Sequence, residues 1–365
     1  MILRHDPDLA TLREVTREFL GREPVVADDE PKWKPAQWSR ACAELGLAGV
    51  AEPEELGGAG IGYAGLAVVL EEAGRALSPL PILGSVVLAQ GLLARAGDAD
   101  ARADLLPALL DGSRTATVAL DALRRDGTIP GELRAAADAQ GSWVITGSTS
   151  FVLDGPTADW VFLRADTPDG PRLFMVDSDG PNTTVTAQDS MDLTRSFARL
   201  DFRSAPARPL GAPGAADAVL ADLRTLLTIA VACEQLGGAE RALAMAVEYV
   251  QVRVQFGRVI GSFQAIKHRC ADLAIQLDNA RSALDHAVWA LHEHPGHLPT
   301  AAPMAAVECA RAFVACAREN IQLHGGIGFT WEHPAHLYFR RATTDAALFG
   351  DVNRHRADLL AATGI

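Results

Sequence analysis

The chain has 365 residues, of which 48% are hydrophobic and 22% are charged. This composition is typical of a folded protein of two or three domains and excludes a mostly disordered chain. The 33 basic and 46 acidic side chains give a net charge of −13, and an acidic surface repels nucleic-acid phosphates and anionic membranes. We therefore expect neither nucleic acid nor a membrane as a partner.

The N-terminal segment MILRHDPDLATLREVT lacks the basic and apolar regions of a signal peptide. Charged residues interrupt each apolar stretch before about 18 residues accumulate, so we expect a cytoplasmic protein. The five cysteines form no Cys-x-x-Cys pair and lie within apolar helical patterns, where a reduced thiol packs as a small hydrophobic group. No GxxxxGK phosphate loop is present.

Residues 36–112 have apolar side chains at intervals of three and four, as in WSRACAELGLAGV and YAGLAVVLEEAGRAL. This spacing is typical of amphipathic helices. Glycine and proline interrupt it at EELGGAGIG (54–62) and SPLP (78–81). We expect an N-terminal helical domain over residues 1–113.

Residues 115–202 contain short runs rich in Val, Ile, Phe and Thr, such as SWVITG, DWVFLRA and PRLFMVD, separated by Gly, Pro and Asp. This pattern is typical of a small antiparallel β-barrel or sandwich, which we expect over residues 114–210. The segment SAPARPLGAPG (204–214) has the composition of a linker.

Long helical patterns return from residue 215, with further helices expected at about 262–294, 300–323 and 332–347. They predict a four-helix bundle over residues 211–365, with a short tail helix after Gly350. The sequence therefore predicts an α+β multidomain fold in the order helical domain, small β-barrel domain, helical bundle.

Two segments of the predicted bundle resemble the acyl-CoA dehydrogenase family. RVQFGRVIGSFQAIKHRCADL (253–273) is similar to the pattern R-x-x-F-G, a short turn, then F-Q or H-Q, and QLHGGIGFTWEHP (322–334) is similar to Q-x-x-G-G-x-G-F. With the EELGGAG loop and the VVLEEAGRAL helix, the resemblance covers nearly the whole chain. It implies the acyl-CoA dehydrogenase fold and FAD-dependent α,β-dehydrogenation of an acyl-CoA thioester.

The resemblance implies that seven residues hold the ADP half of an FAD whose flavin ring lies in a neighbouring subunit. They are Arg253, Phe256, Phe263, Gln264, Gln322, Gly325 and Gly326. A guanidinium and glycine backbone suit a pyrophosphate, and aromatic faces with amides suit an adenine. The alternative is that Phe256 and Phe263 are bundle core and Arg253 forms a surface ion pair; seven matches at the family spacing favour the cofactor role.

In this family a glutamate removes the α-proton of the thioester, which requires a carboxylate. The usual E-G-T segment aligns with Phe349, Gly350 and Asp351, and the second known location aligns with Leu227. Neither phenylalanine nor leucine accepts a proton. We therefore expect both base positions to be empty.

The flavin side of the β domain departs from the family pattern as well. TATVALDAL (115–123) replaces T-E-P-x-A-G-S-D, and FVLDG replaces W-I-T-N-G, with Phe151 and Leu153 at the tryptophan and threonine positions. With the two lost bases, these changes predict a degenerate flavin site beside an intact ADP-binding edge.

The remaining carboxylates have alternative roles. Asp351 is either a displaced base or the N-cap of the tail helix, and we favour the cap. Glu234 is either a relocated base or a polar contact within the bundle, and we favour the contact. The HEHPGH run (292–297) resembles a metal-binding sequence, but its irregular spacing at a helix end favours a solvated terminus, so we expect no metal.

Three hypotheses follow. In the first, the chain is the base-lacking subunit of a heteromeric oxidoreductase and completes the FAD site of a homologous catalytic subunit, in a heterodimer or heterotetramer. Its LFGD ending resembles subunits that act on sterol side-chain CoA thioesters. In the second, it is a homo-oligomeric flavoenzyme that uses Asp351 or Glu234 on an acyl-CoA or carrier-bound acyl group. In the third, it is a flavin-free assembly protein.

Overall fold

The computed structural model describes residues 6–22, 32–119, 123, 131–138 and 140–364. The N-terminal part is helical, and Asp6 starts its first helix by accepting hydrogen bonds from the N–H groups of Asp8 and Leu9. Its helices are α2 (Pro7–Leu20), α3 (Pro35–Leu45), α4 (Gly62–Ala76), the π-helix η3 (Ile82–Gln90), α5 (Gly91–Arg95) and α6 (Ala99–Leu110), with 3₁₀ turns η1 (Leu47–Gly49) and η2 (Glu54–Leu56).

Within the described residues the middle part forms one sheet with its own apolar core, which includes Ile145, Phe174 and Phe202. Its strands are β1 (Ala116–Val118), β2 (Gly131–Ala137), β3 (Trp143–Leu153), β4 (Trp160–Thr167), β5 (Gly170–Asp177), β6 (Thr183–Gln188), β7 (Phe197–Pro206) and β8 (Arg208–Leu210). They lie in the order β6-β7-β3-β2-β4-β5-β8, with β1 beside β4. The sheet is mixed, because β1 and β2 both pair with β4 in parallel.

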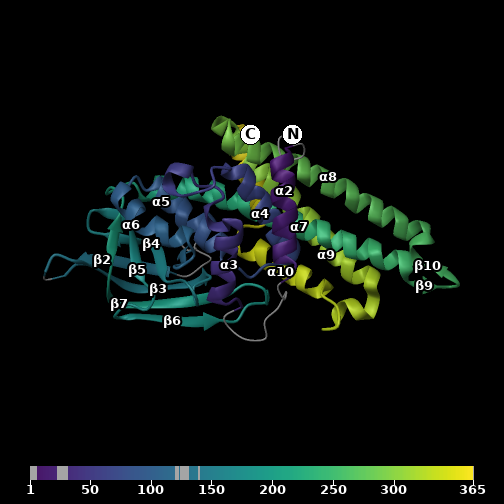
Figure 1. Ribbon diagram of the computed structural model, residues 1–365, viewed down its shortest axis with the longest axis horizontal. Helices are drawn as coiled ribbons and strands as arrows, with labels where there is room; N and C mark the ends of the chain where they lie inside the picture. The colour runs from purple at the N-terminus through teal and green to yellow at the C-terminus, as the bar shows by residue number, and fades with distance from the viewer. Residues whose placement is uncertain (1–5, 23–31, 120–122, 124–130, 139, 365) are drawn as a thin grey trace.

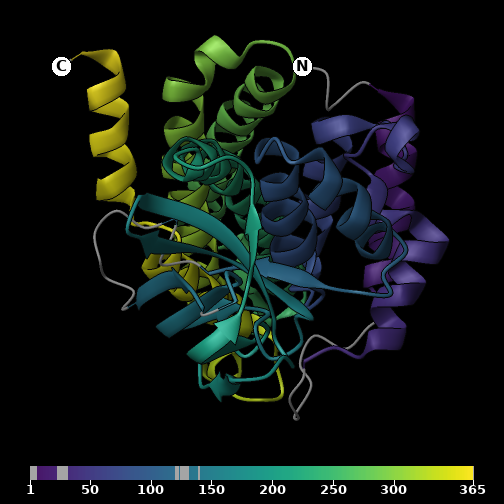
Figure 2. The same cartoon turned by 90° about the vertical axis from the view of Figure 1, so that its left-hand side faces the viewer.

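The C-terminal part is the helical bundle. Its helices are α7 (Ala216–Val252), α8 (Gln264–His292), α9 (Leu298–His324), α10 (Ala335–Leu348) and α11 (Val352–Thr363), with 3₁₀ turns η5 (Ile260–Ser262), η6 (Pro295–His297) and η7 (Gly325–Phe329). A hairpin of β9 (Val254–Gln255) and β10 (Arg258–Val259) projects from the end of the bundle farthest from the sheet (Figure 1). Figure 2 shows α11 standing along the outer side of the bundle. The predicted fold class and order of parts are confirmed. One detail is corrected: the β domain, expected to be antiparallel, has a mixed sheet, because strands far apart in the sequence pair in parallel.

The segment Pro295–Phe329, which contains α9, is long and apolar enough to span a membrane by length and composition alone, and it is the one such segment in the described part of the chain. However, 67% of its most apolar window is buried inside the protein. Helices α7, α8, α10 and α11 all contact α9. Its apolarity is therefore that of the central helix of a bundle.

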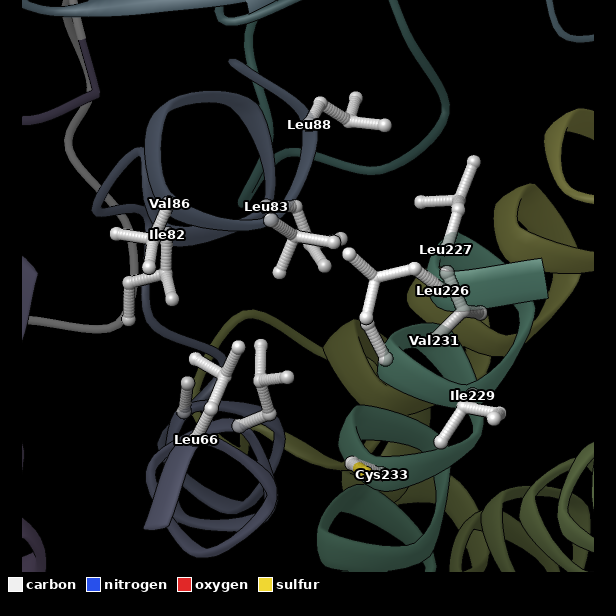
Figure 3. Close-up of a cluster of buried hydrophobic side chains, with 14 of the residues drawn as sticks. Leu66, Ile82, Leu83, Val86, Leu88, Leu226, Leu227, Ile229, Val231 and Cys233 are labelled. Atoms are coloured by element: carbon white, nitrogen blue, oxygen red, sulfur yellow. The ribbon is translucent and has the colours of Figure 1, made fainter. Parts of the chain in front are cut away.

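Helices α4 and α7 cross at very short range. A Cβ atom added to Gly74 would lie 1.9 Å from the carbonyl oxygen of Glu234, and one added to Gly237 would lie 1.8 Å from that of Glu71. Close to this crossing, buried side chains of η3 and α4 on one side and of α7 on the other form one cluster, with Leu83 of η3 directed toward α7 (Figure 3). The two glycines thus set how closely the N-terminal part approaches the bundle.

We expect Gly237→Ala to lower the free energy of unfolding by about 1 to 3 kcal/mol, because the new methyl group meets backbone that has no room to move. This loss should appear although alanine is the better helix former by about 0.5 to 1 kcal/mol. Gly296→Ala is the control, since nothing lies within 4 Å of that added Cβ. Urea unfolding of the three proteins checks the prediction; equal midpoints for Gly237→Ala and the unmodified chain would contradict it.

Candidate functional site

A cavity of about 780 Å³ brings the two predicted base positions together. Leu227 from α7 and Phe349, which follows α10, both line it, together with residues of α9 and α11. Among the described residues that line the cavity, the carboxylates are Asp222 and Asp358, both exposed. The sequence analysis did not single these two out, and neither Asp351 nor Glu234 lines the cavity.

Phe349 is half-buried where α10 ends, and its N–H donates to the carbonyl of Asp345 at 2.9 Å. The guanidinium carbon of Arg195 lies 5.5 Å from the centre of its ring, within the range of a cation–π contact. An aromatic ring therefore occupies the first of the two predicted base positions, with a buried arginine against it.

Asp351 caps α11. Its carboxylate accepts hydrogen bonds from the N–H groups of Asn353 and Arg354 at 2.8 and 2.9 Å, and the residue is exposed. These are the contacts expected of an N-cap aspartate.

Glu234 belongs to a buried group of charges that joins three parts of the chain. Arg195, in the loop before β7, contacts Glu234 of α7 at 2.5 Å and Asp345 of α10 at 3.2 Å. Arg341 of α10 contacts Asp192, which belongs to the same loop, at 2.6 Å. All five residues are at most 7% exposed. A buried ion that loses its partner is strongly destabilising, so these contacts hold the β domain against the bundle. We call these five residues the buried charge network.

Two carboxyl groups at this network bind protons more tightly than usual. Burial raises the pKa of Asp154 to about 7, against a smaller lowering by Arg195. Burial likewise raises the pKa of Asp345 to about 6, against lowering by Arg195 and Arg341. The shared cause is burial, which disfavours the charged form of each carboxyl group and outweighs the attraction of the arginines.

The flavin-side positions of the β domain carry apolar side chains. Leu153 is 1% exposed and belongs to the same core as Leu227, and Phe151 packs against that core. Phe151 has a φ of 54° and its N–H donates to Oε1 of Gln188 at 2.8 Å. Residues 120–122 of the altered 115–123 segment lie outside the described residues.

The first half of the predicted ADP-binding edge is the β9–β10 hairpin and the start of α8. Phe256 and Gly257 both have positive φ, 53° and 75°, as in a two-residue type I′ turn. This turn leaves Phe256 92% exposed, so Phe256 is not bundle core. Its ring meets that of Phe263 edge-on, with centroids 6.2 Å apart, and Arg253 is exposed at the start of the hairpin.

Arg258 is a further residue of this edge that sequence reasoning missed. Its guanidinium carbon lies 4.0 Å from the centre of the Phe263 ring, a close cation–π contact. Arg258 directly follows the Phe-Gly pair of the recognised motif. Its contact with Phe263 forms only because the hairpin folds back toward that ring, which the sequence pattern does not show. Gln264, the next residue, is exposed.

The second half of the edge is the end of α9. Gln322 is exposed on its last turn, and Gly325 ends it with a φ of 65°. Gly326 has no atom within 4 Å of an added Cβ and no positive φ, so nothing within this chain requires a glycine there. The two halves meet through a small core in which Leu323 of α9 packs with Val250 of α7 and with Ile260 and Ile266. An open glycine, an exposed guanidinium and exposed rings at this end of the bundle fit a pyrophosphate and an adenine that approach from outside the chain.

In the described part of the chain, no group of three His, Cys, Asp or Glu side chains is arranged to hold a metal ion. In the HEHPGH run, the ring of His294 instead lies 4.2 Å from that of Trp289. This run therefore contributes an exposed aromatic contact at the end of α8.

Comparisons with known proteins identify the family. Residues 6–113 match the model of the acyl-CoA dehydrogenase N-terminal domain, and residues 225–363 match that of the acyl-CoA dehydrogenase C-terminal domain. Acyl-CoA dehydrogenase IpdE2 of Mycobacterium tuberculosis is 39% identical over 312 residues, 85% of this chain and 81% of that protein. The chain belongs to the acyl-CoA dehydrogenase family.

Solved structures with similar sequences include two whose names each give a pair of proteins. A Tcur3481-Tcur3483 steroid acyl-CoA dehydrogenase variant is 32% identical with a TM-score of 0.86, covering 98% of both chains. The ChsE4-ChsE5 complex from Mycobacterium tuberculosis is 30% identical with a TM-score of 0.88, covering 100% of this chain and 99% of the other. By sequence alone, acyl-CoA dehydrogenase FadE27 of Mycobacterium tuberculosis is also similar, with 35% identity over 87% of this chain and 85% of that protein.

The raised pKa of Asp154 predicts how stability depends on pH. The folded chain holds a proton on this carboxyl up to about pH 7, whereas the unfolded chain loses it near 3.8. The folded state then binds more protons between these values, so stability falls as the pH rises through them, by up to about 1.4 kcal/mol per pH unit.

Asp154→Asn should remove this part of the pH dependence, since its amide has no proton to lose. Urea unfolding from pH 4 to 8 measures it, with the exposed Asp169→Asn as control. The prediction requires that the stability of Asp154→Asn relative to the unmodified chain increases with pH. Parallel curves would show that Asp154 is ionised in the folded protein throughout.

Proposed function

We propose that this chain is the base-lacking subunit of a heteromeric acyl-CoA dehydrogenase, and that its ADP-binding edge completes the FAD site of a homologous catalytic subunit. The observation that carries the proposal is a contrast within one chain. The cavity that holds both base positions presents Leu227 and Phe349 there, whereas the edge at Arg253 and Gly326 is exposed and open. Bound FAD would supply the hydride acceptor, as it does in this family.

The ADP half of the cofactor has a fitting set of groups on this chain. Arg253 would pair with the pyrophosphate, and Gly325 and Gly326 would let the backbone approach it. Phe256 and Phe263 offer ring faces to an adenine, and Gln264 and Gln322 offer amides. The strongly exposed ring of Phe256 supports a role in contact with something outside this chain.

The flavin half fits this chain poorly. Phe151 and Leu153 place hydrocarbon where the family pattern has tryptophan and a threonine hydroxyl, and both pack against the helical core. The contrast between the two halves supports an FAD shared between subunits, with its reactive ring held by the partner.

The heteromeric state and the substrate class are supported by the relatives. One of the two similar structures described above is named as a complex of ChsE4 and ChsE5, and the other carries the names of two proteins, Tcur3481 and Tcur3483, and is named as a steroid acyl-CoA dehydrogenase. We infer that this chain also assembles with a second acyl-CoA dehydrogenase chain, and that the complex acts on a steroid-type CoA thioester.

A self-sufficient homo-oligomer with a relocated base receives less support. The carboxylate of Asp351 accepts two backbone hydrogen bonds, and that of Glu234 contacts Arg195. Asp222 and Asp358 do line the cavity, so they are the carboxylates that a homomeric mechanism would have to use.

The isolated chain, supplied with FAD, should not oxidise octanoyl-CoA or cholyl-CoA, and Phe349→Glu should not create this activity. A new carboxylate adds rate only where cofactor and thioester are already positioned, and here it would stand beside Arg195, while the flavin-side positions Phe151 and Leu153 pack against the helical core. A dye-reduction assay compares both proteins, with Phe349→Gln as the uncharged control.

A large gain in Phe349→Glu alone would mean that the chain positions its own flavin and that only the base is missing. Turnover by the unmodified chain at about 1 per second, an ordinary enzymatic rate, would contradict the proposal outright. A repeat with Asp222→Asn and Asp358→Asn would then identify the base.

In the complex of this chain with its acyl-CoA dehydrogenase partner, Arg253→Ala should weaken FAD binding about tenfold to a hundredfold. The reason is the loss of a charge-assisted hydrogen bond, worth about 1.5 to 3 kcal/mol. The measurement is an FAD titration of the deflavinated complex. Arg134→Ala, which changes an 81% exposed arginine of β2, is the matched control. An unchanged FAD affinity in Arg253→Ala would show that the proposed shared FAD site is wrong.

A further inference from the structure

Three aromatic rings are stacked at the end of the bundle that carries the ADP-binding edge. The ring of His324 lies between those of Tyr249 and His333, with centroid distances of 4.2 and 4.0 Å. His324 is 5% exposed, whereas Tyr249 and His333 are half-buried. The three rings come from the end of α7, the end of α9 and the loop before α10.

Each segment of the predicted ADP-binding edge is joined through the backbone to a residue that carries one of these rings. The carbonyl of Tyr249 accepts a hydrogen bond of 2.9 Å from the N–H of Arg253, the residue that ends α7. His324 stands two residues after Gln322 and immediately before Gly325. Along the chain these two segments are separated by the whole of α8 and α9, so their relative position depends on contacts between them.

The central ring is held in a defined orientation. Nδ1 of His324 lies 2.8 Å from the carbonyl oxygen of Asn320, and because a carbonyl only accepts, this nitrogen carries a proton. On the next turn, a Cβ added to Gly328 would lie 3.0 Å from the Cβ of His324. The turn Gly325–Phe329 therefore folds back over His324 and requires a glycine to do so.

The outer histidine is fixed as well. The N–H of Ala335, the first residue of α10, donates to Nδ1 of His333 at 3.2 Å. Burial lowers the pKa of His333, and His324 and Arg241 lower it further. His333 thus faces His324 as a neutral ring whose orientation is set by the start of α10.

We propose that His324 is a positioning residue for the ADP-binding edge: stacked between Tyr249 and His333, it holds the Arg253 end of α7 in register with the Gln322–Gly326 end of α9. This inference rests on the proposed function of that edge. A flat ring in this place fixes both distance and tilt between the two segments, because stacked rings resist both sliding and opening. Removing the ring frees the two halves of the edge to move independently.

The first test uses the isolated chain and no cofactor. Amide hydrogen exchange should become faster in His324→Ala both at residues 249–256 and at residues 322–329, since the stack supports both segments. His324→Phe keeps a flat ring and should retain slow exchange. The control is His294→Ala, which removes another stacked imidazole at the opposite, exposed end of α8. Unchanged exchange in His324→Ala would overturn the proposal.

The second test measures FAD affinity in the complex with the partner subunit. His324→Ala should lose about three- to tenfold in affinity, the amount expected for one to two aromatic contacts, and His324→Phe should recover most of it. If Arg253→Ala weakens FAD binding and His324→Ala does not, the positioning role is wrong and the shared site stands. If neither variant changes FAD affinity while His324→Ala still exchanges faster, the shared site is wrong and the stack is only structural.

Discussion

The contacts of two buried arginines determine how the parts of this protein are placed. Arg195 and Arg341 join the loop before β7 to α7 and α10 through Asp192, Glu234 and Asp345. Removal of either guanidinium would leave three buried carboxylates facing a single arginine, which costs far more than the loss of a surface pair. The relative position of β domain and bundle is therefore tightly specified, and Phe349 is held against Arg195 as one consequence.

This arrangement separates the chemistry of the chain into two places. Near the buried charge network, the cavity between α7, α9 and α11 is lined by Leu227 and Phe349 at the two predicted base positions. At the far end of the bundle, the β9–β10 hairpin and the end of α9 expose a guanidinium, aromatic rings and glycines (Figure 1). A subunit that serves a partner's cofactor needs the second place intact and tolerates the loss of the first.

The long helices of the bundle could be predicted from sequence because their apolar spacing persists over many turns; α8, expected at 262–294, spans Gln264–His292. The π-helix η3 could not, because residues 82–90 are almost uniformly buried and have no periodicity. The parallel pairing of β1 with β4 depends on register between distant strands, which local patterns do not encode. The motif predicts the ADP-binding edge, but the Arg258–Phe263 contact and the buried charge network join residues that come together only in the folded chain.

The visible absorption spectrum of the purified chain, alone and together with its partner, tests the central claim most directly. The account predicts that the chain alone binds no stoichiometric flavin, and that the complex binds FAD whose affinity depends on Arg253 of this chain. One FAD per subunit in the chain alone, with oxidation of an acyl-CoA, would show that it is a self-sufficient enzyme. No flavin in either preparation would show that the fold serves assembly without the cofactor.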